Sequence, residues 1–228
     1  MDSAVAALEE YLRREDTLTA MVLRSISPAS GRAYLTSRAK RNLDLAISAP
    51  AALLSAPLIL LVTLINRMLF PAQPALFIQR RVWKAGSALR VVKIRSMARE
   101  KSSAQHVPAK HTSFGRFIRR TSIDELPQFA QVWRGQLTLI GIRILPVEIH
   151  QLLERSWSQR RYADWRAVYD RGPLGLSCVH QVFRGAGKDD EKRFHRDLFY
   201  AGRASLGFDL YLIWRTLVRI AESIVDST

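Results

Sequence analysis

The chain has 228 residues, 48% of them hydrophobic, which is enough for one domain with a core and too apolar for a disordered protein. Its 35 Lys and Arg against 20 Asp and Glu give a net charge of +15, which favours a polyanionic partner: nucleic acid, an anionic membrane surface or a phosphorylated substrate. The single cysteine, Cys178, excludes a disulfide framework and a paired-thiol metal motif, and the five histidines show no metal-ligand spacing.

Residues 1–37 are predicted to form a helical appendage. Apolar residues recur there at roughly helical spacing until Ser27-Pro28 and Gly31 break the pattern. The segment lacks the basic start, apolar block and cleavage site of a signal peptide, so none is expected.

The strongest compositional signal is Leu45 to Ile65, which contains no charged residue. A helix of this length can cross a bilayer, and a buried core helix is less expected. Pro50 and Pro57 each remove a backbone donor and tend to kink a helix. Both flanks are basic, with Arg38, Lys40 and Arg41 before the segment and Arg67, Arg80 and Arg81 after it. Because Lys and Arg tend to stay cytoplasmic, these flanks suit a helix that bends and returns to the same face; a single kinked span fits equally well.

The character of the chain changes after this segment. Two short strands, 75–79 and 89–95, are predicted to pair as a hairpin around a turn at 84–87. From Arg80 to Arg120 there are 12 Lys or Arg and one acid. Such a run is often a solvated basic face, but beside an apolar membrane segment it is also expected to lie against anionic lipid headgroups.

The stretch 119–128 combines two arginines with the adjacent carboxylates Asp124 and Glu125 where a helix is predicted to begin. Ser122 and Glu125 have the spacing of a capping box. One interpretation is a well-capped surface helix, which the stretch taken alone favours because capping boxes are common. The other is a site for phosphate chemistry, in which arginines and a helix N-terminus bind phosphate and carboxylates hold a metal ion.

The rest of the chain predicts an α+β fold, mostly helical with a small sheet or hairpin. The expected elements are a helix over 126–133, a strand over 137–143 that presents Arg143, helical structure over 146–170, a strand over 177–183, and an amphipathic helix at about 203–224. The last helix is expected to pack on the core with one edge near the membrane. Neither a P-loop nor a dinucleotide-binding motif is present.

Several blocks, in this order and spacing, resemble the bacterial sugar transferase family, the monotopic phosphoglycosyl transferases. The resemblance covers roughly residues 38–220. Lys40-Arg41-Asn42-Leu43-Asp44 resembles the family's K-R-x-x-D block, and the other matching blocks are Phe77-x-Gln79-x-Arg81-Val82, Lys93-Ile-Arg95-Ser-Met97, the run 115–128 and the ending 205–216.

The resemblance implies a monotopic membrane protein with three parts. These are the appendage 1–37, a Pro-bent re-entrant membrane helix over 38–68, and a catalytic domain over 69–228 on the cytoplasmic face of the bacterial inner membrane, with amphipathic interfacial helices. Such enzymes move a sugar 1-phosphate from a UDP-sugar to undecaprenyl phosphate, a polyprenyl phosphate lipid, and release UMP. This is a first membrane step of glycan, including exopolysaccharide, biosynthesis.

The resemblance also implies roles for five residues. Asp124 would be the nucleophile that forms a covalent phospho-sugar intermediate, which the lipid phosphate then resolves. Glu125 would be its catalytic partner and a ligand of Mg²⁺, a metal that takes few carboxylates together with substrate phosphate oxygens. Arg119 and Arg143 would bind substrate phosphates, with Lys93 in the same basic wall.

One departure from the family pattern bears on activity. The family's G-P-R-P is Gly141-Ile142-Arg143-Ile144 here, so the loop that aims Arg143 is expected to be less rigid. An alternative hypothesis is therefore a catalytically weak homologue that acts as a membrane scaffold in a glycan pathway. A nucleic-acid binder is not favoured, because no base-stacking or groove-reading motif is visible. A homo-oligomer is left open.

Overall fold

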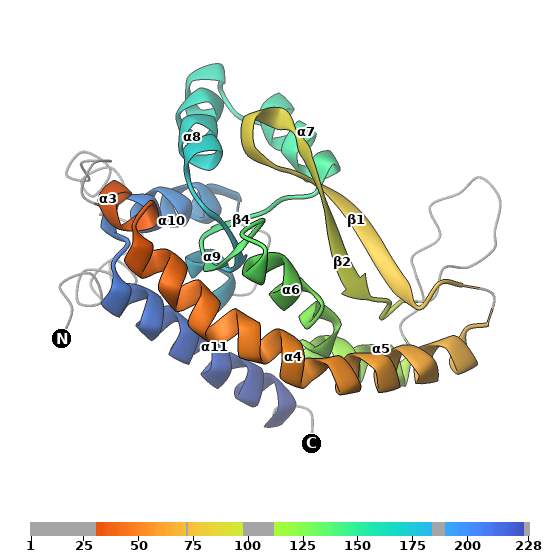
Figure 1. The fold of residues 1–228 in the computed structure, drawn as a ribbon. Helices are drawn as coiled ribbons and strands as arrows, with labels where there is room; N and C mark the ends of the chain where they lie inside the picture. Colours follow the sequence, from red (N-terminus) through yellow and green to blue (C-terminus); the bar gives the residue numbers. More distant parts are fainter. Residues whose placement is uncertain (1–30, 72, 98–111, 184–189, 226–228) are drawn as a thin grey trace.

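A computed structural model describes residues 31–71, 73–97, 112–183 and 190–225. The part of the predicted helical appendage before residue 31 lies outside these ranges. The described chain is mostly helical with two small sheets, as the α+β prediction requires (Figure 1).

The elements follow one another in this order. The first half comprises α3 (Arg32–Leu35), α4 (Arg38–Leu69), β1 (Leu76–Val82), η1 (Lys84–Gly86), β2 (Ala88–Ile94), α5 (Ser113–Arg120), η2 (Ile123–Glu125) and α6 (Gln128–Trp133). The second half comprises β3 (Thr138–Ile140), β4 (Ile142–Arg143), α7 (Val147–Ser156), α8 (Gln159–Arg171), β5 (Leu174–Ser177), α9 (Val179–Val182), α10 (Asp190–Arg203) and α11 (Leu206–Val225).

Helix α4 contains the whole uncharged segment. The Ser37 side chain caps it by accepting the Lys40 N–H, and the helix then continues for 32 residues through Pro50 and Pro57. Figure 1 shows that its direction changes near the middle, as expected when prolines interrupt the backbone hydrogen bonds. By length and composition α4 could cross a membrane. Whether it re-enters the same face stays a prediction.

The start of α4 is fixed to the core by a buried polar network. Lys40 Nζ lies 2.6 Å from Asp209 Oδ2 and 2.8 Å from the Ile140 carbonyl oxygen. The Asp44 carboxylate accepts the Thr138 hydroxyl at 2.6 Å and the Leu139 N–H at 3.0 Å. A buried charge is tolerated when it is paired and hydrogen-bonded, and both conditions are met here.

The far end of α4 contacts the same folded domain. Val62 packs with Ile94 and Ile118 in a second, smaller hydrophobic cluster. Asn66 Nδ2 donates to the Arg95 carbonyl oxygen at 2.6 Å, at the end of β2. Both ends of this apolar helix are therefore tied to the domain that follows it.

The predicted hairpin is confirmed. Strands β1 and β2 pair antiparallel, with Phe77 opposite Lys93, and η1 forms the turn, where Gly86 has a φ of 78°. The amide of Gln131 on α6 covers part of β2: its Oε1 accepts the Val92 N–H at 3.3 Å and its Nε2 donates to the Arg90 carbonyl at 2.9 Å. These bonds hold α6 against the strand that carries Lys93.

A parallel sheet in the order β3-β5-β4 lies in the main core. Its strands come close together at Gly141 and Gly175, where a side chain on Gly175 would collide with the Gly141 backbone. The largest fully buried side chains around the sheet are Trp165, Tyr169, Tyr200, Phe199 and Phe208.

The predicted strand over 177–183 is wrong. Strand β5 ends at Ser177, and α9 follows because the Cys178 side chain accepts the Gln181 N–H at 3.3 Å and begins a helical turn. Helix α10 has no counterpart in the elements predicted from the sequence.

Helix α11 confirms the predicted final helix and has two unlike sides. Phe208 and Leu212 are fully buried, whereas Trp214 and Leu217 on the other side are 55% and 62% exposed. The second half of α4 also exposes large apolar side chains, among them Leu54 at 80% and Met68 at 81%. Both helices run along the lower edge of the molecule in Figure 1.

Candidate active site

The acidic pair lies in η2, a single helical turn between α5 and α6. The capping-box prediction is wrong: Ser122 makes no side-chain cap, and its φ of 56° and ψ of 18° place it in the left-handed region. It is the one non-glycine residue with positive φ among those described. This conformation costs energy and turns the chain sharply before Asp124, and α6 starts only after Pro127.

Glu125 is ion-paired with Lys93, which β2 brings across from the hairpin. The two side chains are 21% and 14% exposed. Burial alone would raise the pKa of Glu125, but the positive charges of Lys93, Arg143 and Arg81 outweigh it and hold that pKa below its ordinary value. Glu125 is therefore an ionised carboxylate inside a ring of cations.

Asp124 is more deeply placed, with 8% of its surface exposed. Burial first, and then repulsion from Glu125, raise the pKa of Asp124 to about 6, although Lys93 and Arg119 act to lower it. Two neighbouring carboxylates thus have pKa values displaced in opposite directions, a pattern typical of paired groups with different chemical roles.

Arg143, at the end of β4, faces the same site. It contributes to the lowering of the Glu125 pKa, and its guanidinium donates a hydrogen bond to Gln181. Arg119, in the last turn of α5, is exposed and donates to the Met97 sulfur at 3.0 Å. The structure therefore brings Lys93 and Arg143 close to Glu125, with Asp124 beside Glu125 and near Lys93, and with exposed Arg119 near Asp124.

Arg81 belongs to this cluster, although the sequence did not single it out as a site residue. Its side chain is buried, donating to the Ile144 carbonyl at 2.8 Å and to Gln79 Oε1 at 2.9 and 3.1 Å. Burial and the charge of Arg143 lower the pKa of Arg81 to about 10. The signal that could have found it is its place in the Phe77-x-Gln79-x-Arg81 block.

The side chains around Asp124 and Glu125 suit the binding of a hard divalent cation only in part. Within the described ranges no three His, Cys, Asp or Glu side chains gather at one point. The carboxylates of Asp124 and Glu125 could supply one or two oxygen ligands, as Mg²⁺ accepts, if substrate phosphates and water complete the shell. The surrounding cations would oppose binding of the metal alone and favour binding together with a polyanion.

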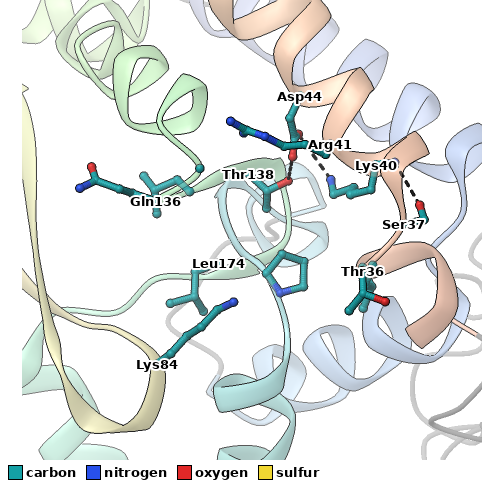
Figure 2. Close-up of a pocket in the computed structure, with 13 residues that line it drawn as sticks. Thr36, Ser37, Lys40, Arg41, Asp44, Lys84, Gln136, Thr138 and Leu174 are labelled. Carbon is teal, nitrogen blue, oxygen red and sulfur yellow. Dashed lines mark hydrogen bonds and ion pairs between the residues drawn. The ribbon is translucent and has the colours of Figure 1, made fainter.

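A separate cavity of about 190 Å³ lies at the start of α4 and includes none of the predicted site residues. Figure 2 shows Lys40, Asp44 and Thr138 at its wall, where their charges and hydroxyl are already engaged in the buried network. Lys84 of the hairpin turn reaches in from the opposite side. The two carboxylates with displaced pKa values, Asp124 and Glu125, lie outside this cavity.

Comparisons with known proteins show the family of the chain. A family model described as bacterial sugar transferase matches residues 35–223. The chain is 35% identical to a UDP-glucose:undecaprenyl-phosphate glucose-1-phosphate transferase of Caulobacter vibrioides, over 78% of this chain and 68% of that protein.

Two further relatives differ in how much of their length is matched. An exopolysaccharide production protein of Rhizobium leguminosarum is 30% identical, over 78% of this chain and 93% of the relative. A UDP-N-acetylgalactosamine-undecaprenyl-phosphate N-acetylgalactosaminephosphotransferase of Aeromonas hydrophila is 28% identical, over 78% of this chain and 42% of its own length. This chain thus spans less than half of the Aeromonas relative.

Proposed function

The chain belongs to the bacterial sugar transferase family, and on that premise we propose that it transfers a sugar 1-phosphate from a UDP-sugar to undecaprenyl phosphate, releasing UMP. The observation that carries the proposal is a buried Asp124 beside an ionised Glu125: Lys93 lies near both carboxylates, Arg119 lies near Asp124, and Arg81 and Arg143 lie near Glu125. This arrangement offers a carboxylate nucleophile and the positive charge that phosphoryl transfer needs.

The proposed reaction has two displacements at one phosphorus. An Asp124 carboxylate oxygen attacks the phosphorus next to the sugar, a new oxygen–phosphorus bond forms, and the bond to the oxygen bridging the two phosphates breaks, so UMP leaves with that oxygen. A phosphate oxygen of the lipid then attacks the same phosphorus and displaces the Asp124 carboxylate. The product is a polyprenyl diphosphate sugar, and the enzyme is returned unchanged.

The cations have the complementary role. Lys93, Arg81 and Arg143 would neutralise the charge of the two phosphates, and arginine suits phosphate because its planar donors bind two oxygens at once. Arg119, which is exposed, would meet the donor as it enters. Glu125, with Asp124 beside it, would hold Mg²⁺, which supplies further neutralisation of phosphate charge when bound.

We also propose that α4 enters the inner membrane from the cytoplasmic face and returns to it, with residues 69–228 as a cytoplasmic catalytic domain. Support comes from the two ends of α4: Lys40 binds the core sheet and helix α11, and Asn66 binds the end of β2, so both ends contact one domain. The exposed apolar side chains of α4 and α11 would face lipid.

A direct assay tests the reaction. Detergent-solubilised protein is incubated with undecaprenyl phosphate, Mg²⁺ and each of UDP-glucose, UDP-galactose and UDP-N-acetylgalactosamine, the sugars named for its relatives. We expect UMP release with at least one donor, dependent on the lipid for continued turnover. Folded protein that releases no UMP with any donor would overturn the enzymatic proposal and favour the scaffold hypothesis.

A further inference from the structure

We infer that Gln181 and Asp197 are positioning residues that hold Arg143 in its phosphate-binding orientation, taking the place of the missing prolines. The inference rests on the proposed function, because it concerns how the phosphate-binding arginine is aimed. Neither residue is expected to touch the substrate. Both act through Arg143.

The backbone around Arg143 is fixed without proline. Ile142 and Ile144, its neighbours on β4, are 0% and 2% exposed, so the main core anchors the chain on both sides of the arginine. Helix α10, which carries Asp197, packs against β4, and the Asp197 carboxylate lies near Arg143. A position held between buried neighbours and beside a buried carboxylate has little freedom to turn.

Asp197 is suited to this task because it is itself immobilised. It lies in α10, is 2% exposed, and accepts the Trp165 indole N–H at 3.2 Å. Trp165 is a fully buried residue of α8, and Asp197 therefore joins α8 to α10, the helix that packs against the strand carrying Arg143. Arg193 also contributes positive charge near this carboxylate.

Gln181 orients the other end of Arg143. It lies in the short helix α9, whose start is capped by Cys178 and whose Val182 carbonyl accepts Arg219 Nη1 at 3.0 Å. The Gln181 side-chain oxygen accepts from the Arg143 guanidinium. A neighbouring helix, fixed at both ends, thus sets the direction of the guanidinium.

The chemistry of the acceptor matters as much as its position. An amide oxygen is neutral, so Gln181 orients the guanidinium without cancelling its charge. A guanidinium has five N–H donors, and one bond to Gln181 leaves others for phosphate oxygens. A carboxylate at this position would form a stronger bond to Arg143 but would compete with the phosphate. Glutamine at position 181 therefore orients the Arg143 guanidinium and leaves its other N–H groups free to bind phosphate.

Two substitutions of Gln181 separate the effect of orienting Arg143 from the effect of adding a charge beside it. Gln181→Leu removes the acceptor, and Gln181→Glu keeps an acceptor but adds a negative charge. We expect both to lower kcat/KM for the UDP-sugar by roughly tenfold to a hundredfold, the usual range for residues that orient a ligand-binding group. Gln181→Glu should in addition raise KM and leave Tm unchanged. Gln151→Glu, an exposed α7 position, is the matched control and should have wild-type kinetics.

A double-mutant cycle tests that Gln181 acts through Arg143. If it does, Gln181→Leu should have little further effect on kcat/KM once Arg143 is Lys, because the fork that Gln181 orients is gone. Asp197→Asn, which keeps an acceptor oxygen, should be milder than Asp197→Ala. Full additivity of Gln181→Leu and Arg143→Lys would overturn the inference, as would wild-type kinetics in both Gln181 variants. Absence of UMP release from the wild-type protein would instead count against the proposed function itself.

Discussion

At the scale of single residues, the site depends on two adjacent carboxylates that the fold treats differently. Asp124 is buried and has a pKa raised to about 6, whereas cations hold the pKa of Glu125 down. The left-handed Ser122 turns the chain just before the two carboxylates, and Lys93 lies near both of them. Adjacent residues of similar chemistry thus acquire different protonation behaviour from their surroundings.

Replacing the proposed nucleophile gives the first prediction. Asp124→Asn should reduce UMP release to background and abolish covalent capture of the sugar phosphate, because an amide cannot attack the phosphorus. Stability should not fall, since the variant removes a buried carboxylate whose charge is disfavoured. Labelled UDP-sugar, followed by denaturing separation of the protein, measures capture; retained turnover would show that Asp124 is not the nucleophile.

The buried Asp197 predicts how stability depends on pH. Burial raises the pKa of Asp197 to about 7, against the lowering effects of Trp165, Arg193 and Arg143. The folded state therefore binds more protons than the unfolded state between its ordinary value of 3.8 and about 7. This contribution to stability is fully present below the ordinary value and is lost as pH rises to about 7.

As pH rises from 3.8 to about 7, Asp197→Asn should lose less stability than the wild type does. Tm in detergent at several pH values measures the difference. Asp164→Asn, at an exposed position of α8, is the control and should follow the wild-type curve. If Tm fell with pH equally in the wild type and in Asp197→Asn, the raised pKa of Asp197 would not be the cause of this pH dependence.

At the scale of elements, the start of α4 is tied to the core by charges that are distant in sequence. Lys40 and Asp209 are 3% and 0% exposed, and their side chains lie 2.6 Å apart. Tyr34 and Tyr200 donate to the same carboxylate at 2.9 and 2.8 Å. The K-R-x-x-D block thus begins the apolar helix α4 and also anchors that helix to the sheet.

Breaking this anchor gives the third prediction. Lys40→Met should destabilise the protein by about 3–5 kcal/mol, because it leaves Asp209 buried without its cation. Adding Asp209→Asn should recover part of the loss by removing the unpaired charge. Denaturant unfolding in detergent measures both, and Lys84→Met, at an exposed position, is the matched control. An equal loss in the single and double variants would contradict the ion pair as the cause.

At the scale of the whole molecule, the contacts at both ends of α4 predict its topology. Arg38 and Arg67 are exposed and lie on opposite sides of the uncharged segment. Cysteines introduced at these two positions should both react with a membrane-impermeant reagent in inside-out vesicles and stay protected in intact cells. Native Cys178 is buried and serves as the unlabelled background. Labelling of the two positions from opposite faces would show a single span.

The sequence by itself determined the features that depend on neighbouring residues. The uncharged segment, the hairpin and the final helix were predicted from local pattern. Their elements are confirmed because period, turn chemistry and composition act over short distances, whereas the capping box predicted at Ser122 and Glu125 is not formed.

Only the tertiary structure decided which of these features meet. Lys40 and Asp209 are 169 positions apart, and Arg143 and Gln181 are 38 apart, so no local pattern could pair them. The inclusion of Arg81 in the site likewise depends on packing between the hairpin and the core. The role of a charged side chain is set by the burial and the partners that the fold supplies, and these are properties of contacts between distant segments.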